Sequence, residues 1–395
     1  MMINKKVTDK LVTIVSTLLN IFLHIDYLFH SFKILKFFSR LFALYPLNSD
    51  CTKLEILYDN FVWLFIHFHF WVAAAATLVA IYKARSDLSI WLIAFSELII
   101  IIEIIVAMIL YRLQRSRLKI LMHIFEDFVK DPDDSKIQLI RRNAKEHIKV
   151  FSILALLFII VVIMYVYRAL STRPYQLLLS GYYPCTSDSL IIWLVVFFHQ
   201  CILVIYSPST FASDSIVTVL IFAAIIKLQK IRPRFRNIEN YAQLVGCINE
   251  HQHIIWFVQE INYVIRLFVF KSIFCLAALQ LGVGVILFMP NISVFTRIQF
   301  LLLFTVTIFR IYIYSYCAEI LTKSGLDLGF AVYSSRWYDQ RRKMVLAKSI
   351  IICRCQKPLL IAINGIIPAL GMRYLARFLY LTFSYIITLQ AMTRT

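Results

Sequence analysis

Charged residues are scarce in this chain. They make up 16% of its 395 residues, while 61% are hydrophobic; soluble proteins average about 25% charged residues. So little charge excludes a soluble globular domain. Several apolar stretches reach about 20 residues, the length that crosses a hydrocarbon layer of about 30 Å. Because backbone polar groups must be satisfied within the lipid, the sequence predicts an all-α polytopic membrane protein.

Motifs of catalysis and metal binding are also missing. The sequence has no Walker loop, dinucleotide-binding glycine pattern, H-E-x-x-H or G-x-S-x-G, so we expect neither enzyme activity nor a cofactor. The eight cysteines form no C-x-x-C pair, and we expect no structural disulfide. His67 and His69 lie two positions apart, which on a helix separates them by about 200°. We interpret them as interface or lipid-facing side chains rather than joint metal ligands.

Seven apolar segments can cross a membrane. We predict transmembrane spans at 55–82, 89–111, 150–167, 189–226, 267–288, 298–321 and 371–390. Of the 41 Lys and Arg residues, 31 lie before the first span or in alternate loops. Such an excess marks the cytoplasmic side, so we predict an intracellular N-terminus and an extracellular C-terminus, the reverse of a G-protein-coupled receptor. The net charge of +19 then fits contact with anionic membrane lipids rather than nucleic acid.

The spans divide the chain into four regions. We expect a cytoplasmic or interfacial segment at 1–54, six spans with their loops at 55–321, cytoplasmic helices at 322–370, and the last span with a short tail at 371–395. Within the first region, residues 32–44 suit a helix lying on the membrane surface, which Pro46 would end. In 227–266, apolar residues recur at helical spacing outside the bilayer. That stripe requires a covering partner, either another cytoplasmic helix or a neighbouring subunit.

Glu97, Glu103, Asp214 and Lys271 are among the ionisable residues that fall inside predicted spans. Such groups are costly in hydrocarbon unless they face a cavity or a partner. They indicate either hydrogen bonding between helices or a route for a ligand or ion. A secondary transporter would use the second arrangement, but the sequence has no inverted repeat to support it.

The outer halves of the spans are rich in aromatic residues. The break Ser207-Pro208-Ser209 and the glycines Gly282 and Gly284 should bend or thin two spans, which favours a cavity. An apolar cavity with few polar groups suits a small volatile or lipid-like ligand, although an aromatic belt with ordinary packing accounts for the same residues. The candidate ligand-binding residues are Trp91, Phe95, Phe158, Tyr165, Trp193, Phe197 and Phe304.

Three blocks of the sequence resemble the insect odorant receptors. They are CINEHQHIIWFVQEIN (247–262), AVYSSRWYD (331–339), and the run from RCQKPL (354–359) to SYIITL (384–389). GYYPC (181–185) is a weaker match. The related gustatory receptors end their last span with Thr-Tyr, five apolar residues and Gln. Here four residues separate Ser384-Tyr385 from Gln390, which favours the odorant branch.

The resemblance implies a ligand-gated, non-selective cation channel in the plasma membrane of sensory dendrites. An odorant-tuned subunit of this family assembles with a shared co-receptor subunit into a heterotetramer and binds a volatile molecule in the outer half of its helices. By resemblance, the last helix lines the pore, with Ile386, Leu389 and Gln390 at its outer end. The blocks that contain His251, Trp337 and Tyr338 would belong to the cytoplasmic anchor between subunits. The alternative is a gustatory-type channel that acts as a homotetramer.

Overall fold

The computed structural model describes residues 51–130, 138–139, 153–167, 177–183, 190–289, 292–335, 337–363 and 365–394, together with 36, 39–40, 42 and 44–46. Long helices dominate these ranges. In chain order they are α3 (Lys53–Lys83), α4 (Leu88–Leu113), α5 (Arg115–Lys130), an unlabelled helix (Ile153–Tyr167), α7 (Leu190–Tyr206), α8 (Ser209–Arg236), α9 (Tyr241–Phe288), α10 (Val294–Tyr333), the short 3-10 helix η1 (Trp337–Asp339), α11 (Arg342–Cys355) and α12 (Met372–Arg394).

The helices match the seven predicted spans. Among the described residues, six apolar helical segments are long enough to cross a membrane, and α7 and α8 together form one of them. Ile153–Tyr167 is a shorter apolar helix at the position of the third predicted span. The prediction of an all-α membrane fold is therefore confirmed.

Polar side chains fix where several helices begin. Thr52 and Glu55 form a reciprocal capping box at the start of α3. The side chains of Asp87, Asn240 and Ser293 accept hydrogen bonds from the first backbone N–H groups of α4, α9 and α10. These oxygens satisfy donors that a helix leaves without an internal partner.

The predicted break in the fourth span is confirmed. α7 ends at Tyr206 and α8 begins at Ser209, so the turn falls at Ser207 and Pro208. The second span continues beyond a turn at Gln114 into α5. α9 instead runs unbroken for 48 residues through Gly282 and Gly284. These glycines therefore do not interrupt the helix.

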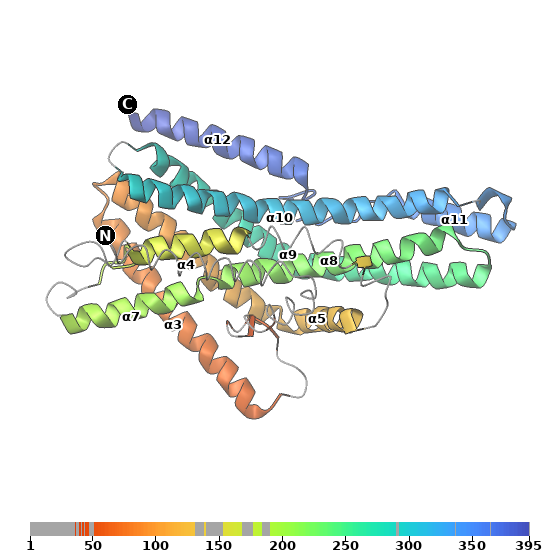
Figure 1. Cartoon of the computed structure of the whole chain (residues 1–395), viewed down its shortest axis with the longest axis horizontal. Helices are drawn as coiled ribbons and strands as arrows, with labels where there is room; N and C mark the ends of the chain where they lie inside the picture. The colour runs from red at the N-terminus through yellow and green to blue at the C-terminus, as the bar shows by residue number, and fades with distance from the viewer. Residues whose placement is uncertain are drawn as a thin grey trace, which may run out of the picture.

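Long helices join the membrane-spanning part to the region predicted to be cytoplasmic. α8, α9 and α10 run side by side toward one end of the molecule, where α11 packs against α10, and α12 lies along an edge at the other end (Figure 1). The predicted boundary at 321/322 falls inside α10. The apolar stripe of 227–266 is covered by the chain itself, since Leu244, Cys247 and Ile261 are buried in the main core.

The N-terminal region is described at only a few positions. Phe42, Leu44 and Tyr45 are buried in the main core, so this part of the segment packs against the helices. Most of the predicted surface helix at 32–44 lies outside the described residues. Cys185 and Asn291 also lie outside them.

Candidate functional site

A network of buried charges joins four helices in the middle of the bundle. The guanidinium of Arg310 on α10 donates to both oxygens of Glu103 on α4, at 2.6 and 3.1 Å, and to Asp214 on α8, at 2.6 Å. Lys271 on α9 lies 3.3 Å from Glu103, and Tyr314 donates to Asp214. Two carboxylates therefore face two cations, and the network has no formal net charge.

This network confirms one of the two interpretations of the polar residues within spans. Glu103, Asp214 and Lys271 make hydrogen bonds between helices. Sequence reasoning missed Arg310 and Tyr314, which complete the group. The sequence does contain a signal for Arg310, because this cation lies in a predicted span. A cation in a span requires a partner of opposite charge, and a carboxylate in another span can supply it.

Glu97 has a different role in the N-terminal half of α4. Its Oε2 accepts a 2.6 Å hydrogen bond from the backbone N–H of Ser180. In the same short segment, 177–183, the side chain of Gln200 bonds both the N–H and the carbonyl of Leu179, at 3.1 and 3.3 Å. The Tyr182 N–H donates to the carbonyl of Ala76 on α3. These bonds hold 177–183 against α3, α4 and α7.

The predicted ligand-binding aromatics form three groups rather than one. Trp91 stacks on Phe95 in α4, with ring centroids 5.1 Å apart, and Trp91 packs against the same outer cluster that contains Phe304. Trp193 stacks on Phe197 in α7 at 5.0 Å.

The third group lies close to the charge network. Phe158 packs edge-on against Phe211 of α8, with centroids 4.7 Å apart. The guanidinium carbon of Arg310 lies 5.7 Å from the centre of the Phe211 ring. The Phe211 ring thus contacts both Phe158 of the Ile153–Tyr167 helix and the Arg310 guanidinium of the charge network. Tyr165 lies on the same Ile153–Tyr167 helix.

The histidines of α3 make contacts between and within helices. Nδ1 of His69 lies 2.7 Å from Nδ1 of His199 on α7, so one ring donates to the other. His67 is buried and bonds the carbonyl of Trp63 one turn earlier. Within the described ranges, no group of three potential His, Cys, Asp or Glu ligands gathers to hold a metal ion.

The three predicted pore residues differ in exposure. Ile386 is 2% exposed, whereas Leu389 is 39% exposed, and Gln390 is half-buried. Ile386 lies in a core cluster with Val283 and Ile286 of α9. The structure therefore places Ile386 on the face of α12 that contacts its own subunit.

The base of α12 is fixed to two other helices. The Met372 N–H at its first turn donates to Glu319 of α10 at 3.2 Å. The preceding turn is closed by two 2.8 Å bonds between the backbones of Ile363 and Ile367, with Gly365 at a positive φ of 80° that favours glycine. Asn262 of α9 accepts from the N–H of Ala362 at 3.0 Å.

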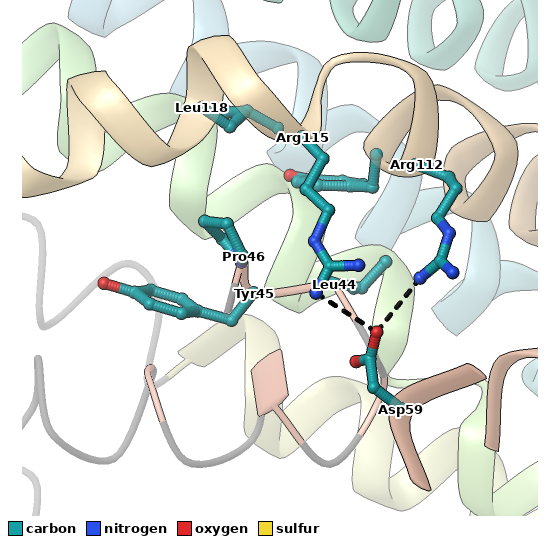
Figure 2. Close-up of a pocket in the computed structure, with 8 residues that line it drawn as sticks. Leu44, Tyr45, Pro46, Asp59, Arg112, Arg115 and Leu118 are labelled. Atoms are coloured by element: carbon teal, nitrogen blue, oxygen red, sulfur yellow. Dashed lines mark hydrogen bonds and ion pairs between the residues drawn. The ribbon is translucent and has the colours of Figure 1, made fainter. Parts of the chain in front are cut away.

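An ion pair joins α3 to the end of α4 and the start of α5. Asp59 of α3 accepts from Arg112 at 3.0 Å and lies 3.3 Å from Arg115, as Figure 2 shows. The small adjoining cavity has a volume of about 10 Å³ and is also lined by Leu44 and Tyr45. That space is about the size of one water molecule, so this site ties the N-terminal segment to the bundle rather than holding a larger ligand.

The predicted anchor residues do not share one surface. His251 is buried and its ring meets the edge of Phe235. Trp337 contacts Tyr333 and Tyr338, with ring centroids 6.4 Å apart in both pairs. Tyr338 is 67% exposed. Of the three, Tyr338 offers the largest surface to another subunit.

The sequence and fold identify the family. The family model described as 7tm Odorant receptor matches residues 92–380, which is well over half of the chain. The chain therefore belongs to the 7tm odorant receptor family. The predicted family resemblance is confirmed.

Curated relatives from Drosophila melanogaster match parts of the chain. Odorant receptor 19a and putative odorant receptor 19b are each 26% identical over 132 residues, which cover 33% of this chain and 34% of the relative. Putative odorant receptor 59c is 24% identical over 190 residues, covering 45% of each chain. The matched segments thus span between a third and a half of these relatives.

Solved structures share the fold over nearly the whole chain. The insect olfactory receptor OR5 from Machilis hrabei superimposes with a TM-score of 0.80 and 14% identity, covering 92% of this chain and 98% of that one. The same receptor in complex with eugenol gives the same score and identity, covering 94% and 99%. At this identity, the comparison shows the fold.

Proposed function

We propose that this protein is the odorant-binding subunit of a ligand-gated, non-selective cation channel. A small volatile molecule binds in the outer half of the helices and favours the open state of a pore lined by α12. The observation that carries the proposal is family membership over 92–380. The arrangement of α12 supports the channel part.

The outer half of the bundle offers suitable chemistry for an apolar ligand. Its described interior holds the Trp91–Phe95 stack and Phe304, in a cluster of aliphatic and aromatic side chains. The segment 177–183 lies against α3, α4 and α7, where Glu97 and Gln200 bind its backbone. Few polar groups among apolar walls would bind a small volatile molecule and fix its orientation. The charge network below would form the polar floor of this region.

The exposure of α12 supports its role as the pore wall. Tyr385, Ile387 and Leu389 are exposed in the single subunit, so this helix has a face that only lipid, water or other subunits can cover. Leu389 would form an apolar constriction that prevents wetting in the closed state, and Gln390 would offer an amide to a passing cation. Because Ile386 packs inside the subunit, we favour the more exposed Leu389 over Ile386 as a pore residue.

We propose that the subunit works in a heterotetramer with a co-receptor in the plasma membrane of sensory dendrites. The cytoplasmic ends of α8, α9, α10 and α11 would supply the contacts between subunits, with Tyr338 on the exposed surface. The bilayer lipids would cover the exposed apolar residues of α3 and α7.

Co-expression with the co-receptor tests this function. We expect cation currents in response to at least one member of a volatile panel that includes eugenol, the ligand of the similar structure. Cells with the co-receptor alone are the control for its own responses. Currents from this chain expressed alone would indicate a homomeric channel instead. Surface-expressed subunits that give no current with any ligand would contradict the proposal.

A further inference from the structure

α12 packs on α9 at a position that has no side chain. A Cβ added to Gly284 would lie 2.7 Å from Cγ1 of Ile386 and 3.3 Å from its Cγ2, and closer still to Cδ1. Both residues are buried. Isoleucine is branched at Cβ and has few alternative rotamers, so it cannot easily turn away. Even alanine at position 284 therefore requires α12 to shift.

This contact is part of the attachment of the outer part of α12. The most buried apolar residues of the helix are Leu375 and Ile386. Leu375 packs near the base, with Leu276 and Ile311. In the outer part, Ile386 is the buried member of the cluster formed with α9 and α10. The base of α12 is thus held by several bonds, while its outer part packs through Ile386, the buried Thr382 and the contact of Phe383 with Phe304.

We propose that the Gly284–Ile386 contact positions α12 in the non-conducting state and sets how often the channel opens without ligand. The inference rests on the proposed function, in which α12 lines the pore. If opening moves the outer part of α12 away from α9, Ile386 must leave Gly284. A methyl group at position 284 then raises the free energy of the packed state alone, and the population shifts toward the open state.

The first test is the Gly284→Ala substitution in the co-expressed channel. We expect the ligand-free current, normalised to surface expression, to rise at least about fivefold, and the ligand dose-response curve to shift to lower concentrations. The reversal potential should not change, because the substituted residue lies outside the pore. Gly246→Ala on the same helix is the matched control, since no atom lies within 4 Å of its added Cβ.

The second test removes the Ile386 side-chain atoms that the methyl group added at position 284 would meet. Ile386→Ala removes all three atoms that the new methyl group meets, so the double variant should have a lower ligand-free current than Gly284→Ala alone. Thermal unfolding of the purified protein in detergent gives a readout without ligand or current. There, Gly284→Ala should lower the melting temperature, and the two substitutions together should lower it by less than the sum of their separate effects.

Distinct results contradict the inference and the proposed function. If the wild-type channel responds to ligand and Gly284→Ala leaves both ligand-free current and sensitivity unchanged, the inference alone is wrong. A raised current that Ile386→Ala does not reduce also overturns it. If the wild-type subunit reaches the surface and conducts under no condition, both proposals fail.

Discussion

Arg310 is the residue on which the buried charge network depends. Its guanidinium makes three of the network's hydrogen bonds and reaches two carboxylates on different helices. A planar group with several fixed donors can do this, whereas an ammonium acts as a single point charge. Removing one partner of a buried ion pair typically costs about 3–5 kcal/mol, because the remaining charge is left without compensation.

The Arg310→Lys substitution should therefore destabilise the protein despite keeping the charge. We expect loss of at least one carboxylate contact and a reduction in unfolding free energy of about 2–4 kcal/mol, measured as a lower melting temperature in detergent and lower surface expression. Arg232→Lys is the control, because Arg232 is about half exposed in its ion pair with Asp327. Equal melting temperatures for the two variants would show that the network contributes little.

Lys348 of α11 is a buried cation of a different kind. It is 0% exposed, and its ammonium donates to Ser335 Oγ at 3.1 Å. Burial lowers its pKa below the usual value of 10.5. The charged form is thus disfavoured by folding, and this cost is fully present below the lowered pKa and disappears as the pH rises toward 10.5.

We expect Lys348→Met to stabilise the subunit. At neutral pH the melting temperature should rise by about 1–3 °C, because an ammonium no longer has to be desolvated. The difference from wild type should shrink at alkaline pH. Lys343→Met, at an exposed position of the same helix, is the control. A melting temperature that falls would indicate a stabilising partner for the ammonium in the assembled channel.

At the scale of helices, the base of α12 is held by a cap from another helix. Glu319 of α10 accepts the first-turn N–H of Met372, and a carboxylate also interacts favourably with the positive end of the helix dipole. Gly371 leaves room for it, since a Cβ there would lie 2.6 Å from the Glu319 carboxylate. α10 and α12 are therefore joined at the point where the last helix begins.

Glu319→Ala should weaken this junction. We expect a loss of about 0.5–2 kcal/mol, the usual range for removing a helix cap, seen as a lower melting temperature. Glu319→Gln retains an oxygen acceptor without the charge and should lose less. If Glu319→Ala leaves the melting temperature unchanged, the contact between Glu319 and Met372 does not stabilise the junction.

Sequence reasoning predicted the helices well and their contacts poorly. The break at Ser207 and Pro208 follows from local chemistry, because proline lacks the backbone donor. The Gly284–Ile386 contact joins residues about 100 positions apart. Its prediction requires knowing which helices are neighbours and how each is rotated, information that a single helix pattern does not contain. The glycine at 284 indicated thinning, but not the residue that uses the space.

At the scale of the whole molecule, the predicted orientation depends on the distribution of positive charge. Lys and Arg are concentrated in alternate loops, which places the N-terminus inside the cell and the C-terminus outside. The helix lengths and the fold agree with seven spans in either orientation, so orientation stays a prediction. It also determines which end of α12 is the outer mouth of the pore.

Epitope accessibility tests this orientation. An antibody should label a C-terminal epitope on intact cells and an N-terminal epitope only after permeabilisation. A tag in the cytoplasmic region around Tyr338 should behave like the N-terminal one. The opposite labelling pattern would reverse the topology and exclude the proposed placement of the ligand site and the anchor.

The central claim is that α12 of this chain lines a ligand-gated cation pathway. Its most direct test is a cysteine scan of residues 384–392 in the co-expressed channel, with a charged thiol reagent applied outside while ligand is present. We predict that ligand-evoked current falls at positions with helical spacing that include Leu389, and that Ile386 does not react. The same reagent on the unsubstituted channel is the control. Current that is unchanged at every substituted position would contradict the account.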